Sequence, residues 1–88
     1  MKALITGASS GIGRYMAYIL AKKGYDLILV ARRENRLKEI KDDIKNVNVK
    51  YIACDVSKKE NCFKLYEEVK NENIDILINN AGFGLAGE

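Results

Sequence analysis

The sequence contains no histidine and no proline, and it has only two cysteines. Because Cys54 and Cys62 do not form a CxxC pair and no histidine accompanies them, we expect neither a metal site nor a disulfide framework. Both cysteines are interpreted as reduced and at least partly buried small apolar residues. No proline-marked or low-complexity linker divides the chain, so residues 1–88 are predicted to form a single domain.

Blocks of one charge are also missing. The chain has 15 basic and 12 acidic residues, mixed along its length, which give a net charge of +3. Nucleic acids and anionic membranes attract clusters of basic residues, so we expect neither as a partner. No apolar run reaches the roughly 18 residues that span a bilayer, and no apolar signal-peptide core follows Met1, so we expect a cytoplasmic protein.

Short apolar runs alternate with helical periods, which is typical of alternating strands and helices. Four strands are expected, over residues 2–6, 27–31, 47–53 and 74–79. The first helix is expected to end at Lys22-Lys23-Gly24, the second to cover about residues 34–45, and the third to open at Ser57 with a Ser57/Glu60 capping box.

The strand patterns predict an α/β fold with a Rossmann-type doubly wound parallel sheet, truncated to four strands and three helices. Runs 2–6 and 27–31 are apolar throughout, as in strands with helices on both faces, whereas run 47–53 alternates and is expected at an edge. Right-handed crossovers then give the strand order 3-2-1-4. Run 74–79 would lack one neighbour, so an isolated chain is expected to self-associate there.

Each helix is expected to turn one apolar stripe toward the sheet. The stripes are Ile12, Tyr15, Met16, Ile19 and Leu20 in the first helix, Leu37, Ile40 and Ile44 in the second, and Cys62, Leu65, Tyr66 and Val69 in the third.

A glycine-rich turn, Thr6-Gly7-Ala8-Ser9-Ser10-Gly11-Ile12-Gly13, joins the first strand to the first helix. Backbone N–H groups and the helix dipole bind phosphates at such a position. Gly7 is interpreted as allowing a tight turn, Gly11 as leaving room for a pyrophosphate, and Gly13 as allowing close packing of helix and strand. A plain strand-to-helix connection is the alternative. No Lys-Ser or Lys-Thr follows the glycines, which disfavours a P-loop NTPase.

The residue that reads the adenosine ribose is expected at the end of the second strand. Arg32 and Arg33 stand there. A guanidinium group suits a 2′-phosphate, whereas a carboxylate suits a free 2′-hydroxyl, so the sequence favours NADP(H), with NAD(H) as the alternative. A solvated arginine pair that opens a helix is the other interpretation.

With two further motifs, the sequence resembles the short-chain dehydrogenase/reductase family over essentially the whole chain. Residues 6–13 are similar to its TGxxxGxG element, Asp55-Val56 to the pair that holds the adenine, and residues 79–82 to its NNAG element, in which the first asparagine braces the sheet. Ser10 departs from the many NADP(H)-preferring members that carry a basic residue there. The cofactor-binding residues that this implies are Gly7, Ala8, Ser9, Ser10, Gly11, Ile12, Gly13, Arg32, Arg33, Asp55, Val56, Asn79, Asn80, Ala81 and Gly82.

The resemblance implies hydride transfer between a nicotinamide and a carbonyl or alcohol substrate, with a serine and a YxxxK pair located after NNAG. The chain stops at Glu88, so no catalytic residue is assigned, and this chain alone is expected to be inactive. The YxxxK strings at Tyr18 and Tyr66 precede NNAG and are interpreted as structural. The complete protein is expected to be a homo-oligomer. A non-catalytic dinucleotide-binding sensor or interaction module, or a scaffold with a vestigial site, remains the alternative.

Overall fold

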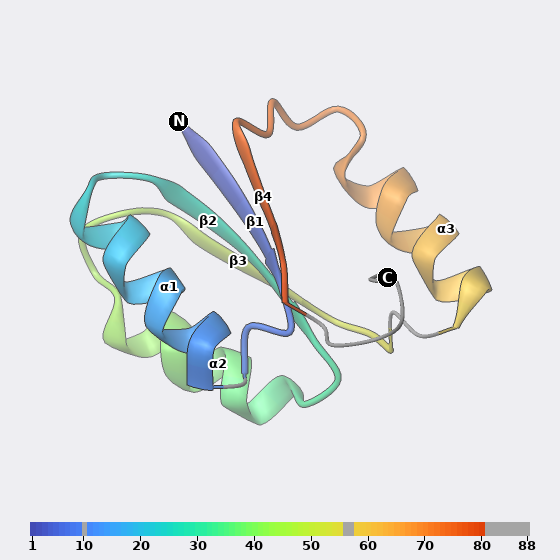
Figure 1. Cartoon of the computed structure of the whole chain (residues 1–88), viewed down its shortest axis with the longest axis horizontal. Coiled ribbons are helices and arrows are strands. Elements are labelled where there is room, and N and C mark those ends of the chain that lie inside the picture. Colours follow the sequence, from blue (N-terminus) through green and yellow to red (C-terminus); the bar gives the residue numbers. More distant parts are fainter. Residues whose placement is uncertain (10, 56–57, 81–88) are drawn as a thin grey trace.

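The structure, a computed structural model, describes residues 1–9, 11–55 and 58–80, without the side chain of Cys62. Strands and helices alternate along the chain, as the sequence predicted (Figure 1). They are β1 (Lys2–Thr6), α1 (Gly11–Lys22), β2 (Asp26–Ala31), α2 (Glu34–Asp43), β3 (Val49–Ala53), α3 (Lys59–Val69) and β4 (Ile76–Asn79). The strands β3 and β4 begin later, and α2 ends earlier, than the sequence pattern indicated.

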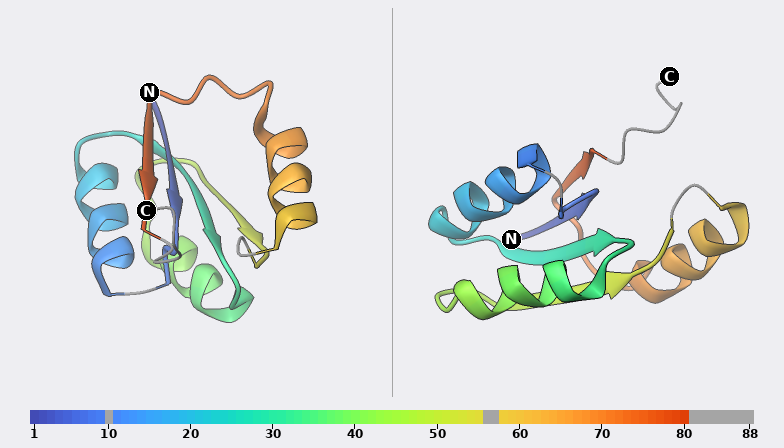
Figure 2. Two further views of the ribbon diagram at one scale, coloured as in Figure 1. Left: turned by 45° about the vertical axis from the view of Figure 1, so that its right-hand side comes forward. Right: turned by 90° about the horizontal axis from the view of Figure 1, so that it is seen from below.

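The four strands form one parallel sheet in the order β3-β2-β1-β4, which confirms the predicted Rossmann-type topology. β3 lies at an edge, in agreement with its alternating pattern. The helices α1 and α2 cover one face of the sheet, and α3 lies on the other (Figures 1 and 2). Because every strand runs in the same direction, the carboxyl ends of β1, β2, β3 and β4 all meet at one edge of the sheet.

The hydrophobic core has a part on each face of the sheet. The strands β1 and β2 are buried on both faces, as their continuous apolar runs predicted. On the side of α1 and α2, the core holds Ile5, Leu27 and Leu29 together with the predicted stripe of α2, Leu37, Ile40 and Ile44. On the side of α3, it holds Leu4, Ile28 and Val30, with partly buried Leu65, Val69 and Ile74 packed against them.

The predicted apolar stripe of α1 is wrong in part. Ile12 and Tyr15 are 69% and 66% exposed. The buried face is turned by about one residue from the predicted one and consists of Leu20 and three small residues, Gly13, Ala17 and Ala21. These small residues let the helix backbone approach the strands closely, whereas the bulkier Ile12 and Tyr15 would hold it away. Leu20 is the member of the predicted stripe that is fully buried.

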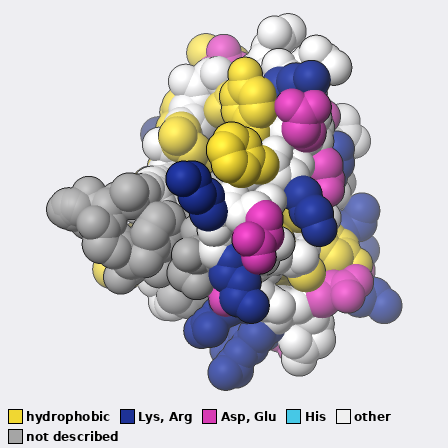
Figure 3. Space-filling view, turned by 90° about the vertical axis from the view of Figure 1, so that its right-hand side faces the viewer, with side chains coloured by type: hydrophobic (Ala, Val, Ile, Leu, Met, Phe, Trp, Pro, Cys, Tyr) yellow, Lys and Arg dark blue, Asp and Glu magenta, His cyan; other side chains and the backbone are white. Residues whose placement is uncertain are grey.

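The prediction for α3 also needs correction. Leu65 and Val69 contact the core, but Tyr66 is 62% exposed, and so is its neighbour Phe63 at 65%. Figure 3 shows hydrophobic side chains among charged ones on this face. Leu65 and Val69 are the described members of the expected stripe that pack against the sheet, so α3 turns the side that carries Tyr66 toward solvent. Lys58, without a side-chain hydrogen bond, is the N-cap of α3, and Ser57 lies outside the described residues.

Cys54 is a reduced and partly buried cysteine, as predicted. The side chain of Cys62 lies outside the described residues. Within the part of the chain that the structure describes, no group of His, Cys, Asp and Glu residues could hold a metal ion. Across the same residues, no helix combines the length and the apolar character needed to cross a membrane.

Candidate functional site

The turn between β1 and α1 is built around a glycine in the left-handed region. Gly7 has a φ of 66°, which side chains with a Cβ rarely adopt, so the predicted need for glycine at this tight turn is confirmed. The next residue ties the turn to the neighbouring strand, since the N–H of Ala8 donates to the carbonyl of Val30 over 3.1 Å. The turn therefore stands at a fixed position above the ends of β1 and β2.

The two glycines at the start of α1 differ sharply in their surroundings. A Cβ added at Gly13 would lie 2.3 Å from the carbonyl oxygen of Gly7 and 3.0 Å from Nδ2 of Asn80. The same addition at Gly11 would meet no atom within 4 Å. Gly13 is thus needed for packing, as predicted, while Gly11 leaves open space at the amino end of α1, where helix N–H groups point outward.

A threonine at the end of β1 connects the turn to β4. The hydroxyl of Thr6 donates to Oδ1 of Asn79 over 2.9 Å and accepts from the backbone N–H of Asn80 over 3.1 Å. Thr6 is buried. These two bonds fit the bracing role that the sequence implied for Asn79, and they fix the end of β4 against the glycine turn.

The arginine pair lies where β2 gives way to α2. The side chains of Arg32 and Arg33 are exposed, and Arg33 is the N-cap of α2 without a side-chain cap hydrogen bond. Among the described residues, neither forms an ion pair. Cations at the amino end of a helix face the positive end of its dipole, so this pair creates a local positive potential, which Glu34 in the first turn of α2 partly offsets.

The end of β3 is held by the start of α3. The carbonyl oxygen of Asp55 accepts from the N–H of Lys58 over 3.2 Å and from Nδ2 of Asn61 over 3.0 Å. One residue earlier, the N–H of Cys54 donates to the carbonyl of Ala31 over 2.8 Å, which continues the β2–β3 ladder. Asn61 was missed in the sequence, since its spacing from Asp55 matches no standard capping pattern.

The sheet brings these separate motifs together. Thr6 pairs with Val30 on one side and with Asn79 on the other, and Ala31 pairs with Ala53. The glycine turn, the arginine pair, Asp55 and the β4 end therefore lie side by side along the carboxyl edge (Figure 2). The helix that follows β1 lies on one face of the sheet and the helix that precedes β4 lies on the other, so the order of the strands reverses between β1 and β4. Open α/β sheets bind ligands at such a position. Of the other predicted residues, Ser10, Val56, Ala81 and Gly82 lie outside the described residues.

A family model described as short chain dehydrogenase matches residues 1–88. The chain belongs to the short-chain dehydrogenase family. The 11-beta-hydroxysteroid dehydrogenase of Pinus massoniana is 48% identical over 86 residues, which are 92% of this chain and 24% of that protein. The very-long-chain 3-oxoacyl-CoA reductase of Candida glabrata is 41% identical over 85 residues, 91% of this chain and 24% of that protein.

Solved structures agree with this assignment. The L-sorbose reductase of Gluconobacter frateurii, solved with NADPH and L-sorbose, is 42% identical with a TM-score of 0.81, and the match covers 94% of this chain and 34% of that one. An alcohol dehydrogenase of Thermococcus sibiricus, solved with 5-hydroxy-NADP, is 38% identical with a TM-score of 0.80, over 86% and 34%. This short-chain dehydrogenase chain spans about a quarter of the length of the curated relatives it matches.

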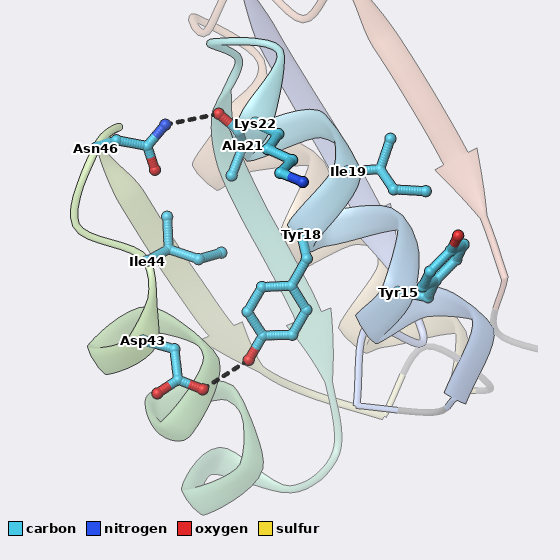
Figure 4. Close-up of a pocket in the computed structure, with 8 residues that line it drawn as sticks. All are labelled: Tyr15, Tyr18, Ile19, Ala21, Lys22, Asp43, Ile44 and Asn46. Atoms are coloured by element: carbon cyan, nitrogen blue, oxygen red, sulfur yellow. Dashed lines mark hydrogen bonds between the residues drawn. The ribbon is translucent and has the colours of Figure 1, made fainter.

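The first YxxxK string of this short-chain dehydrogenase chain lies away from the carboxyl edge. The hydroxyl of Tyr18 donates to Oδ2 of Asp43 over 2.8 Å and so joins α1 to the end of α2 (Figure 4). Burial raises the pKa of Tyr18 above its ordinary value, and the hydrogen bond to Asp43 acts in the same direction. Tyr18 and Asp43 line a pocket between α1 and the end of α2, and Lys22 lines it too and is exposed. These contacts support the structural interpretation of the Tyr18 string.

Proposed function

We propose that this chain binds NADP(H) at the carboxyl edge of its sheet, and that the complete protein moves hydride between the nicotinamide and a carbonyl or alcohol substrate. The observation that carries the proposal is the exposed arginine pair, without an ion-pair partner among the described residues, beside the glycine turn. The proposed cofactor contacts are Gly7, Ala8, Ser9, Ser10, Gly11, Ile12, Gly13, Arg32, Arg33, Asp55, Val56, Asn79, Asn80, Ala81 and Gly82.

The amino end of α1 would hold the pyrophosphate. The open space at Gly11 allows phosphate oxygens to approach the backbone, and the helix dipole favours their negative charge there. Gly13 keeps the helix close to the turn, so that these N–H groups stay in place. The residues present therefore fit a dinucleotide, because Gly11 leaves space at the amino end of α1 and Gly13 lets that end lie close to the turn.

Arg32 and Arg33 would hold the 2′-phosphate. A guanidinium donates two parallel hydrogen bonds to a phosphate, and both arginines are exposed to a ligand at this edge. Two related structures, the L-sorbose reductase and the Thermococcus alcohol dehydrogenase, contain NADPH and a hydroxylated NADP. Asp55 would accept from the adenine amino group, and Asn79 with Asn80 would line the ribose on the nicotinamide side.

The reaction itself requires residues beyond those assigned in this chain. When bound, the nicotinamide supplies or takes up the hydride. The part played by this chain is to bind the dinucleotide and, through Thr6 and Asn79, to hold β4 where the nicotinamide end would lie. We propose that the complete protein is a cytoplasmic homo-oligomer, with its substrate chosen by residues outside this chain.

Calorimetric titration of the chain with NADPH and with NADH tests the proposal. NADPH should bind more tightly, and Arg32→Ala should weaken NADPH binding by about 10- to 100-fold, the value of a charged hydrogen bond, while it leaves NADH unchanged. Lys38→Ala removes the same charge from an exposed position of α2 and serves as the control. Equal or tighter binding of NADH would overturn the NADP(H) assignment, and no binding of either by a folded chain would overturn binding by this chain.

A further inference from the structure

Asn61 connects the start of α3 with the end of β3. It is the third residue of α3, and its Nδ2 donates to the carbonyl oxygen of Asp55 over 3.0 Å. The N–H of Lys58 donates to the same oxygen over 3.2 Å. A carbonyl oxygen can accept two hydrogen bonds, and these two donors use both of its lone pairs. Together they fix the orientation of the Asp55 peptide.

The side chain of Asn61 matters here because the amino end of α3 has weak support. Lys58, the N-cap residue, forms no side-chain hydrogen bond to the helix. Leu65 and Val69, which anchor α3 to the sheet, are one and two turns further along and only partly buried. Asn61 is itself partly shielded from water, so its hydrogen bond competes less with solvent than one on an exposed helix face would.

Asp55 needs such support because it lies beyond the end of β3, where the regular hydrogen bonding between β2 and β3 ends. A hydrogen bond from the N–H of Cys54 to the carbonyl of Ala31 continues the β2–β3 pairing by one residue. The two hydrogen bonds from the start of α3 therefore contribute to the position of Asp55 relative to the site. An asparagine amide is suited to this task, since it is neutral and donates without placing a second charge beside the Asp55 carboxylate.

We propose that Asn61 is a positioning residue for the adenine end of the dinucleotide, which it serves by holding Asp55 in the binding arrangement. This inference rests on the proposed function. Without the hydrogen bond from Asn61, the Asp55 peptide would adopt the binding orientation in only a fraction of the molecules. The apparent dissociation constant for the dinucleotide would rise in inverse proportion to that fraction. Because one hydrogen bond is lost, the expected rise is about three- to tenfold.

The test uses Asn61→Asp, which keeps the shape of the side chain and removes the donor. A carboxylate in the first turn of a helix is favourable, so this variant should stay folded. Asn73→Asp, at an exposed position after α3, adds the same charge and is the matched control. Asn61→Ala is the second variant, and circular dichroism checks that each protein is folded.

Each protein is titrated with NADPH and with reduced nicotinamide hypoxanthine dinucleotide phosphate, which has an oxygen in place of the adenine amino group. The Asp55 carboxylate accepts from the amino group and not from this oxygen, so wild type should prefer NADPH. Both Asn61 variants should weaken NADPH binding by about three- to tenfold. They should also reduce the preference for NADPH over the hypoxanthine analogue. Arg32→Ala should weaken both ligands equally and leave the preference unchanged.

The outcomes separate this inference from the proposed function. Unchanged NADPH binding in folded Asn61→Asp and Asn61→Ala, with wild-type binding intact, would overturn the role of Asn61 alone. An equal loss for both ligands would also overturn it, because a general structural defect does not distinguish the adenine amino group. No binding of NADPH by wild type would instead overturn the proposed function.

Discussion

The hydroxyl of Thr6 donates to Oδ1 of Asn79 over 2.9 Å and accepts from the N–H of Asn80, so one buried side chain joins the end of β1 to the end of β4. Thr6→Val keeps the shape but removes both bonds. We expect it to lower the free energy of unfolding by about 1–3 kcal/mol, because buried polar groups lose a partner. Urea denaturation measures this, and Thr6→Ser, which keeps the hydroxyl, should be clearly more stable than Thr6→Val; equal stability of the two would contradict the bridge.

The topology could be predicted from the sequence because it depends on local patterns. Residues 2–6 and 27–31 are apolar throughout, and such runs occur in strands that are covered on both faces. The alternation of apolar and polar residues around Lys50 predicted that one face of β3 is less well covered, and so that β3 lies at an edge. The motifs at the strand ends then followed, since parallel strands bring their carboxyl ends together.

The rotation of α1 could not be predicted in this way. The sequence pattern favours Ile12 and Tyr15 as buried, because periodicity weighs hydrophobicity and not size. The actual orientation is set by Gly13, whose missing Cβ lets the helix approach the carbonyl of Gly7. Asn61 was missed because its partner is a backbone carbonyl in the connection before α3, at a spacing that matches no standard capping pattern.

The glycines at the start of α1 offer a matched pair of substitutions. Gly13→Ala places a Cβ 2.3 Å from a backbone oxygen that cannot move freely, so we expect a loss of about 1–3 kcal/mol in the free energy of unfolding. Gly11→Ala meets no atom and should be neutral or stabilise the chain by up to about 1 kcal/mol, since alanine favours the helix. Urea denaturation of both variants gives the comparison, and similar losses in both would contradict the packing described for Gly13.

Glu72 should contribute to the acid sensitivity of the fold. The hydrogen bond from Lys2 lowers the pKa of Glu72 below its ordinary value of 4.5, and the charges of Lys2 and Lys50 act in the same direction. A lowered carboxyl pKa gives a stabilisation that is complete above 4.5 and is lost as the pH falls through the folded value. The effect should be small, because this network is solvent-exposed.

Urea midpoints of wild type and Glu72→Gln, compared between neutral pH and a pH below 4.5, check this. Glu72→Gln should lose less stability on acidification than wild type does. Glu68→Gln, at an exposed position of α3, is the control and should follow wild type. An identical pH dependence in wild type and Glu72→Gln would show that the Lys2 contact does not persist in solution.

The outer edge of β4 should make the isolated chain self-associate. In the described sheet β4 pairs only with β1, and its residues Ile76–Asn79 carry neither a charge nor a proline to block further pairing. Leu77 is 65% exposed beside this edge. We expect the mass measured by light scattering to rise with concentration and Leu77→Lys to suppress the rise, because a charge opposes pairing of a second strand. Phe63→Lys, which removes an equally exposed side chain from α3, should have little effect on self-association.

Two outcomes would contradict pairing through β4. A monomeric mass at all concentrations would refute it, and equal suppression of self-association by Leu77→Lys and Phe63→Lys would assign the association to general hydrophobic contact instead.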